Sequence, residues 1–200
     1  MMPAIKPWAL ILLAGCLLGA CASTNQNSYY SLSRGGEATV VADDPNKPAV
    51  LLEPIRLPVA VDRTQLVLRL SDQQLQVLET SRWAQPLKYE LSSSLVADLA
   101  QALPGYQVFE SSKALQRKPQ LSIGLEILQF ESIRGAAATI EARWLIRDRS
   151  GKQTALAGHA LVTEAVHGDS LQALASAHAT ALANISRQIA AGISRDKGGY

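Results

Sequence analysis

Two long stretches of the chain repeat apolar residues at steps of three and four, and this pattern limits the fold more than any other feature. The first stretch carries Leu87, Leu91, Leu95, Leu99 and Leu103, with Pro104-Gly105 after it. The second carries Leu171, Leu174, His178, Leu182, Ile185, Ile189 and Ile193, with Asp169 or Ser170 before it as a cap. Such spacing predicts two amphipathic helices, each with one buried face. Both helices therefore need a partner surface to cover.

Short apolar runs supply that surface as predicted β-strands. They lie at 49–55, 66–70, 75–78, 106–109, 121–130, 139–147 and 154–166. Ser71-Asp72-Gln73 and Asp148-Arg149-Ser150-Gly151 are typical of turns and predict two hairpins. One helix lies between strands and the other closes the chain. The sequence therefore predicts an α/β or α+β fold: a single domain with a mixed β-sheet of about six strands and two long helices.

The first 20 residues are typical of a secretion signal. Met1 to Lys6 carries one positive charge, and the apolar run from Trp8 to Leu18 is shorter than the ~20 residues that a membrane-spanning helix needs. Leu18-Gly19-Ala20-Cys21 then has the pattern of a bacterial lipobox, whose cysteine thiol receives a diacylglycerol. Leu13-Ala14-Gly15-Cys16 fits the same pattern. Cys21 is preferred over Cys16 because its use leaves no free thiol in the mature chain.

Lipidation at Cys21 predicts a domain tethered to a membrane by several acyl chains. The residues after it are Ala22, Ser23 and Thr24, without the Asp that in many Gram-negative bacteria retains a lipoprotein in the inner membrane. The outer membrane, periplasmic face, is therefore expected. The next residues are mostly polar, apart from a strand-like segment at Tyr29 to Leu32. We expect a signal peptide at 1–20, a flexible lipid-anchored tether at 21–47 and one domain at 48–195.

Several classes of function lack their usual signals. The 19 basic and 17 acidic side chains are interspersed, so no nucleic-acid partner is predicted. His159, His167 and His178 form no ligand pattern, so no metal site is expected. Gly-x-Ser-x-Gly and glycine-rich phosphate loops do not occur, so neither catalytic residues nor a cofactor is predicted. We expect His178 to be a partly buried core or interface residue, and Trp83 to pack on the following helix or to serve as a binding anchor.

Four short motifs in a fixed order resemble a known family. They are Tyr29-Tyr30-x-Leu32, Leu57-Pro58, Asp62-Arg63-x-Gln65-Leu66-Val67-x-Arg69 and Arg82-Trp83-Ala84-x-Pro86-Leu87. Together with a strand containing Ala142-Arg143-Trp144, a turn at Ser150-Gly151 and a final Ala-rich helix, they resemble the ABC-type transport auxiliary lipoproteins, the PqiC-like group. The resemblance covers essentially the whole mature chain.

This resemblance implies a periplasmic α/β domain, anchored in the outer membrane, similar to the TolB N-terminal or anticodon-binding-like arrangement. It implies partners in an inner-membrane system of MCE-type lipid-binding proteins, sometimes with an ABC permease and ATPase, that moves lipids between the two membranes. It implies no enzymatic role. Carried over by residue, Cys21 is the lipid attachment point. The motif residues that become candidates for partner contact, or for fold determinants, are Arg63, Leu66, Arg69, Arg82 and Trp83.

Three functions remain open at this point. The first is a docking subunit, as a homo-oligomer or alone, that receives an MCE protein at the outer membrane. The second is an envelope lipoprotein that regulates cell-wall synthesis or outer-membrane assembly, because fold by itself does not separate these roles. The third is direct lipid carriage, which the Leu/Ala-rich composition with 5% aromatic residues disfavours because it is typical of a filled core.

Overall fold

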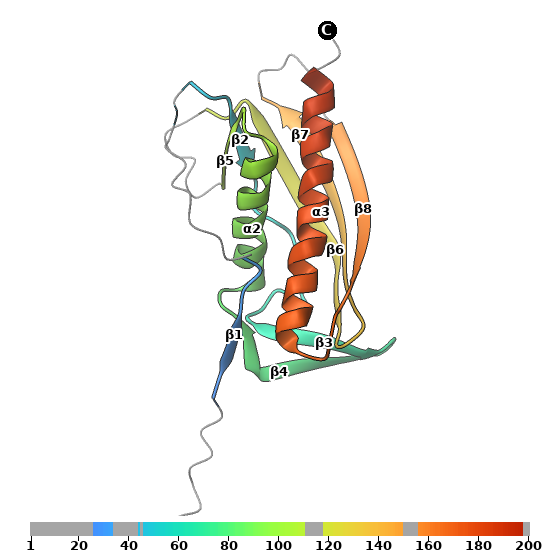
Figure 1. Ribbon diagram of the computed structural model, residues 1–200. Coiled ribbons are helices and arrows are strands. Elements are labelled where there is room, and N and C mark those ends of the chain that lie inside the picture. The colour runs from blue at the N-terminus through green and yellow to red at the C-terminus, as the bar shows by residue number, and fades with distance from the viewer. Residues whose placement is uncertain (1–25, 34–43, 45, 111–117, 150–155, 198–200) are drawn as a thin grey trace, which may run out of the picture.

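The computed structural model describes residues 26–33, 44, 46–110, 118–149 and 156–197 (Figure 1). The expected signal peptide, both cysteines and the expected turn residues Ser150-Gly151 lie outside these ranges. The described elements, in chain order, are β1 (Ser28–Tyr30), β2 (Ala49–Leu52), β3 (Gln65–Ser71), β4 (Gln74–Trp83), α2 (Leu87–Ala102), β5 (Gln107–Glu110), β6 (Leu121–Ile133), β7 (Ala137–Asp148), β8 (Leu156–Ala165) and α3 (Leu171–Lys197).

The strands form two mixed sheets rather than the one sheet of about six strands that was expected. The larger has the order β5-β2-β6-β7-β8, in which β2 runs parallel to β5 and β6, and β6, β7 and β8 are antiparallel. The smaller has the order β1-β4-β3, with β1 parallel to β4. The hairpin β3–β4 pairs with the N-terminal segment instead of joining the larger sheet, which gives eight described strands. The α/β class and the single domain are confirmed, since one core contains side chains from both sheets and both helices.

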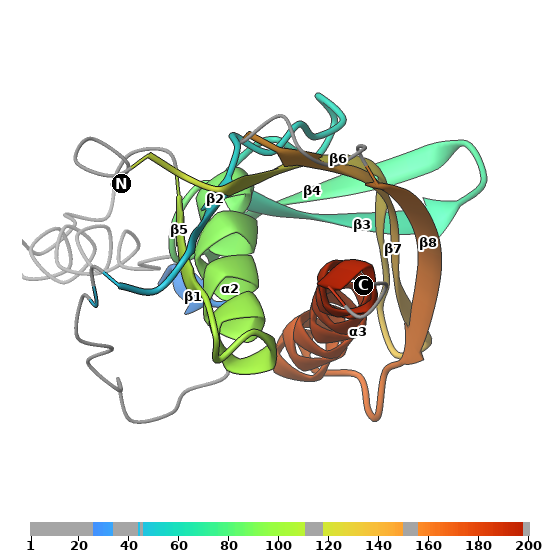
Figure 2. The same ribbon diagram turned by 90° about the horizontal axis from the view of Figure 1, so that it is seen from above.

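The larger sheet curves around the two helices, which lie side by side on its concave face (Figure 2). Alternate residues of β6 and β7 point inward, and α3 packs against β7 and β8. Its Leu182, Ile185 and Ile189 belong to the same core as these inward residues. Many of the remaining buried positions of α3 are alanines, whose small side chains let the helix approach the sheet closely. The smaller sheet lies across the lower end of this assembly in Figure 1.

Both helices match the sequence prediction closely. The leucines of α2 are buried, with Pro86 directly before the helix and Pro104-Gly105 after it. In front of α3, the hydroxyl Oγ of Ser170 accepts a hydrogen bond from the amide of Ala173 at 3.0 Å. Ser170, one of the two predicted caps, therefore stabilises the start of that helix.

The outer face of the larger sheet is polar and paired. Arg143 contacts Glu126 at 2.7 Å, the imidazole of His159 contacts Glu141 at 2.8 Å, and Arg147 reaches Glu53 at 3.2 Å. These pairs are exposed, so each contributes little to stability. They keep this face solvated, as is usual for antiparallel strands with one covered face.

Gly158 of β8 lies opposite Trp144 of β7 in the strand register, and a side chain at that position would overlap the indole ring. We expect Gly158→Ala to destabilise the domain by about 1–3 kcal/mol, because the packed indole has to move. Urea unfolding of the two proteins measures this. Gly105→Ala is the matched control, since Gly105 has an ordinary backbone angle and open space around it. Equal losses in both variants would contradict this packing.

Candidate functional site

A groove opens between the hairpin β3–β4, the loop that precedes β3, and the second half of β6. Its volume is about 120 Å³, and it is lined by Pro58, Ala60, Val61, Val67, Arg69, Leu75, Leu128, Gln129, Phe130, Glu131 and Ser132. We call it the hairpin groove. Leu75 and Leu128, which line it, and Val59 beside it are exposed large apolar side chains. The groove therefore combines exposed apolar surface with one pair of opposite charges.

A β-bulge in β6 creates one wall of the hairpin groove. Before the bulge, the buried side chains of β6 are at odd positions, such as Ile123 and Ile127, and after it they are at even positions, such as Phe130. The ladder with β7 skips Leu128, which is the extra residue. Because a one-residue shift exchanges the two faces of a strand, the bulge turns Glu131 outward and leaves Leu128 exposed at the groove. The break in the apolar alternation at Ile127-Leu128 is the signal in the sequence.

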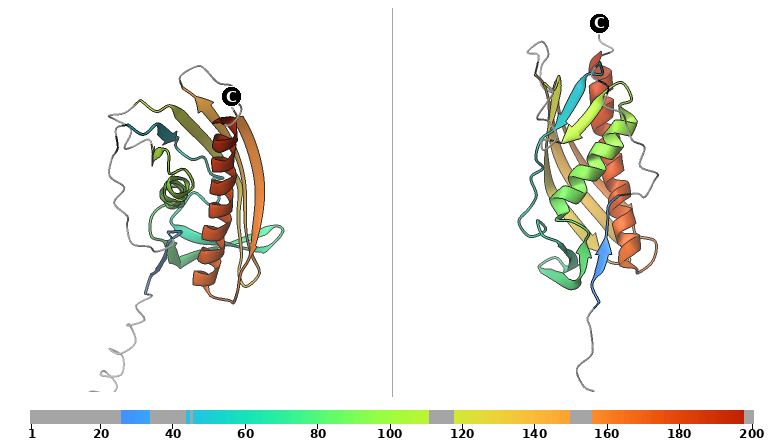
Figure 3. Two further views of the ribbon diagram at one scale, coloured as in Figure 1. Left: turned by 45° about the horizontal axis from the view of Figure 1, so that its top comes forward. Right: turned by 90° about the vertical axis from the view of Figure 1, so that its left-hand side faces the viewer.

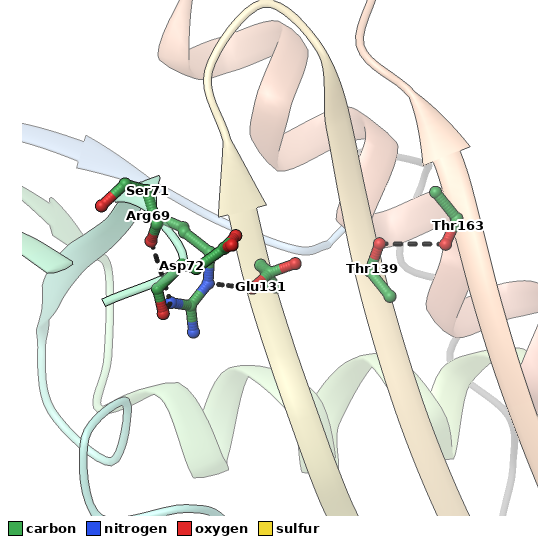
Figure 4. A network of polar contacts seen from close by, with 6 residues as sticks. All are labelled: Arg69, Ser71, Asp72, Glu131, Thr139 and Thr163. Atoms are coloured by element: carbon green, nitrogen blue, oxygen red, sulfur yellow. Dashed lines mark hydrogen bonds and ion pairs between the residues drawn. The ribbon is translucent and has the colours of Figure 1, made fainter. Parts of the chain in front are cut away.

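Arg69 joins the hairpin to the larger sheet. Its guanidinium forms an ion pair with Glu131 of β6, and it also donates to the main-chain oxygens of Ser71 at 3.2 Å and Asp72 at 3.0 Å (Figure 4). Figure 4 also shows the hydroxyls of Thr139 and Thr163, 2.9 Å apart, on the next two strands outward from Glu131. Arg69 therefore connects the hairpin turn to β6 at the rim of the hairpin groove.

Three of the motifs noted in the sequence meet at one place, which we call the motif junction. Tyr29 pairs with Arg82 across β1 and β4, and Gln65 pairs with Arg82 across β3 and β4. The amide of Trp83 donates to the carbonyl of Thr64 at 2.7 Å, and the amide of Leu87 donates to the carbonyl of Arg63 at 3.2 Å. Segments far apart in the sequence are thus joined by main-chain hydrogen bonds.

The five candidate motif residues fall into two groups. Leu66 and Trp83 are buried, with 2% and 3% of their surface exposed, and Nε of Arg63 is buried without a hydrogen-bond partner. Arg69 and Arg82 are partly exposed. The structure brings all five to the smaller sheet or its approach, and it places only Arg69 on the hairpin groove. Leu75 and Leu128 were not among the predicted residues.

The core around Trp83 contains a buried histidine, His178. The His178 ring of α3 stacks on Phe130 of β6, with centroids 4.0 Å apart, and Trp83 meets Phe130 edge-on at 6.0 Å. Nε2 of His178 lies 2.8 Å from Oγ of Ser132, while its Nδ1 is buried without a partner. Since an unprotonated nitrogen costs less to bury unpaired than an N–H, the donor is Nε2. His178 is wholly buried, further inside than expected, and it links α3 to both sheets.

Burial lowers the pKa of His178 from 6.5 to about 3. Between these pH values the unfolded chain binds a proton that the folded domain does not, so stability is fully present above pH 6.5 and is lost as the pH falls. We expect a contribution of at most about 1.4 kcal/mol per pH unit in this window. Urea unfolding at a series of pH values between 3 and 6.5 gives the free energy of unfolding as a function of pH. This free energy should fall less steeply with falling pH in the double variant Ser132→Ala/His178→Phe than in the parent. His159→Gln, at an exposed histidine, is the control, and an unchanged slope in the double variant would contradict the assignment.

The described residues contain neither a cluster of metal ligands nor a helix that could span a membrane. Within these ranges no three His, Cys, Asp or Glu side chains gather in a way that could hold a metal ion. No helix in this part of the chain has the length and apolarity needed to cross a bilayer.

The sequence of the chain is similar to a known protein family and to a characterised relative. Residues 30–190 match the family model described as the ABC-type transport auxiliary lipoprotein component. The chain is 25% identical over 143 residues to the intermembrane transport lipoprotein PqiC of Escherichia coli, a match that covers 71% of this chain and 74% of that protein.

Two solved structures share the fold. An uncharacterised protein has a TM-score of 0.70 and 22% identity, with 84% of this chain and 99% of that chain covered. Protein XCC0632 of Xanthomonas campestris has a TM-score of 0.64 and 20% identity, with 86% and 98% covered. These similarities concern the whole domain that carries the motif junction and the hairpin groove.

Proposed function

This chain belongs to the ABC-type transport auxiliary lipoprotein family, and we propose that it docks an MCE-type protein at the periplasmic face of the outer membrane, within an intermembrane lipid transport system. The observation that carries the proposal is the family match over residues 30–190, which spans both sheets and most of α3. The name of the relative in Escherichia coli, an intermembrane transport lipoprotein, supports the same class of role.

The proposed anchor is a lipid on Cys21. The lipobox Leu18-Gly19-Ala20-Cys21 supports it, and six residues separate this cysteine from the start of β1. The residue directly after Cys21 is Ala22 and not Asp, which supports sorting to the outer membrane. We propose a non-catalytic role for the domain, in which binding and positioning are its only tasks.

The proposed contact with the partner is the hairpin groove. Its volume of about 120 Å³ is below the ~150 Å³ of a cavity that holds one benzene molecule, and far below the ~300–1,000 Å³ of usual small-molecule sites. A groove of this size suits one apolar side chain of a protein partner and is too small for a phospholipid. We therefore favour docking over lipid carriage.

In this proposal, some of the five motif residues contact the partner and the others stabilise the hairpin. Arg69 contacts the partner at the rim of the hairpin groove, where a guanidinium is a frequent source of binding energy. Arg82 is available at the surface of β4. Arg63, Leu66 and Trp83 act indirectly, by holding the hairpin in place.

The test is crosslinking of the full-length lipoprotein in cells, followed by mass spectrometry of what it captures. We expect an MCE protein among the captured partners, and several-fold less of it with Cys21→Ala or Arg69→Ala. Arg143→Ala is the matched control, because Arg143 also forms an ion pair with a glutamate but lies away from the hairpin groove. Recovery of peptidoglycan synthases or of the outer-membrane assembly machinery instead would replace this proposal with the regulatory function.

A further inference from the structure

The segment from Ser28 to Leu32, which begins seven positions after Cys21, is part of the folded domain. β1 pairs with residues 81–83 of β4, and the amide of Ala84 donates to the carbonyl of Tyr30 at 2.7 Å. The carboxylate of Glu90, which is buried in α2, accepts from the Ser31 hydroxyl at 2.8 Å and from the Leu32 amide at 3.0 Å. The Leu32 side chain is buried in the core. The strand-like segment expected at Tyr29 to Leu32 thus packs on the domain, and its start is the point at which the chain toward Cys21 leaves the domain.

The link that remains is short compared with the domain. Six residues lie between Cys21 and Ser28, so even a fully extended chain reaches about 25 Å from one to the other. Helix α3 has 27 residues and is therefore about 40 Å long, and it runs along the long axis of the domain (Figure 1). The link is too short for the far end of the domain to reach the membrane that holds the lipid.

The direction of β1 shows which end of the domain lies near the membrane that holds the lipid. The start of β1 points away from the body at the end that carries the hairpin β3–β4 and the beginning of α3, whereas β2, β5 and the end of α3 lie at the opposite end (Figure 3). The chain therefore leaves the domain from the end formed by the smaller sheet.

The side chains at this exit suit a bilayer interface. Tyr29 is 63% exposed and lies across from Arg82 in the β1–β4 ladder. Tyrosine is enriched at the level of the lipid headgroups, where its ring is apolar and its hydroxyl meets water, and an arginine beside it can bind a phosphate. Acidic side chains such as Asp72 and Glu79 occur on the same hairpin, so the surface has no strong excess of positive charge. Contact would therefore depend little on anionic lipid or on salt.

We propose that the end formed by β1, β4 and β3 rests on the bilayer that holds the Cys21 lipid, with Tyr29 at the headgroup level and the β2–β5 end directed into the periplasm. The occupant of this surface is a lipid membrane. The proposal rests on the anchor in the proposed function and adds the orientation of the domain. It also holds the hairpin groove beside the membrane, where a docked transport protein would deliver or collect lipid.

The test measures depth in the membrane by spin labelling. In the proposed mature lipoprotein, Cys16 has left with the signal peptide and Cys21 is acylated, so an introduced cysteine is its only free thiol. Tyr29→Cys and Leu161→Cys are a matched pair, since Leu161 is 61% exposed on the outer face of β8. Each labelled lipoprotein is reconstituted in vesicles of phosphatidylethanolamine and phosphatidylglycerol, and collisions of the label with oxygen and with a water-soluble nickel chelate are compared.

We expect a ratio of oxygen to nickel collisions that is several-fold higher at position 29 than at position 161, with little change on addition of salt. Leu70→Cys, near the hairpin turn, is a second reporter that leaves β1 unaltered, and its ratio should also exceed that at 161. Equal ratios at all three positions, or a higher ratio at 161, would overturn the orientation. Mass spectrometry of the same samples separates the two proposals, because a chain without acylation at Cys21 would overturn the anchor as well.

Discussion

Replacing Trp83 with alanine is expected to destabilise the domain by about 3–5 kcal/mol, the usual cost of removing a large buried aromatic side chain. Trp83 is 3% exposed and packs edge-on against both Phe130 and His178, the second at 6.4 Å. It therefore joins the smaller sheet to β6 and α3. Urea unfolding followed by circular dichroism gives the free energy of unfolding.

Trp83→Phe is the matched control, because it keeps an aromatic ring in the same space and should cost clearly less. The pair of variants also separates the two roles considered for this residue. A binding anchor would lose partner capture at nearly unchanged stability when replaced with alanine. That result would contradict the core position of Trp83, whereas loss of stability in proportion to the volume removed supports it.

Removing the carboxylate of Glu90 is expected to release β1 from the domain. Glu90→Ala deletes the acceptor of the Ser31 and Leu32 hydrogen bonds and leaves the buried Leu32 amide unpaired. Hydrogen bonds to a charged group contribute about 1.5–3 kcal/mol each, so we expect a loss of about 2–4 kcal/mol after local relaxation. Hydrogen exchange of the Tyr30 and Leu32 amides should become much faster, because β1 has only three residues and depends on this contact.

Gln85→Ala is the control for this effect. Gln85 donates to the other oxygen of Glu90 over 3.4 Å, and its removal leaves the contacts with β1 in place. We expect a small change in stability and unchanged exchange at Leu32. Equal exchange rates in the two variants would show that Glu90 does not hold the segment.

The order of helices and strands could be predicted from the sequence because their patterns are local. Leucines at steps of four in α2 and the stripe of α3 leave one face of each helix apolar, and the turn at Asp72-Gln73 joins β3 to β4 as expected. The choice between one sheet and two is not local. It depends on a pairing between β1, a strand of three residues, and the end of β4. With this pairing the hairpin β3–β4 forms a separate sheet and does not join the larger one.

The candidate site was harder to predict from the sequence than the fold, for two physical reasons. Leu66 and Trp83 are buried in one core, in which Trp83 meets side chains of β6 and α3. Their motif positions alone therefore do not separate a fold determinant from a contact residue. The hairpin groove depends on the bulge at Leu128, whose only sequence sign is two apolar residues in succession within an alternating strand. Arg69 was predicted from its motif, and the structure adds its partner Glu131.

The small volume of the hairpin groove bears on how lipid would move. A domain that holds no lipid in this groove can still act in transport by fixing the end of a partner at the membrane. The proposed orientation serves that task, since β1 and the hairpin β3–β4, which lines the groove, lie at the same end of the domain (Figure 1). In the two proposals, docking and anchoring both use the smaller sheet.

The most direct measurement places a photo-crosslinking amino acid in the hairpin groove of the lipoprotein in living cells. Leu128 is suitable because its side chain lies exposed on the groove, and Leu161 on the outer face of β8 is the control position. If the groove receives the partner, irradiation joins an MCE protein to position 128 and not to position 161. Crosslinks from 128 to cell-wall enzymes alone, or to an MCE protein from 161 alone, would contradict docking through the hairpin groove.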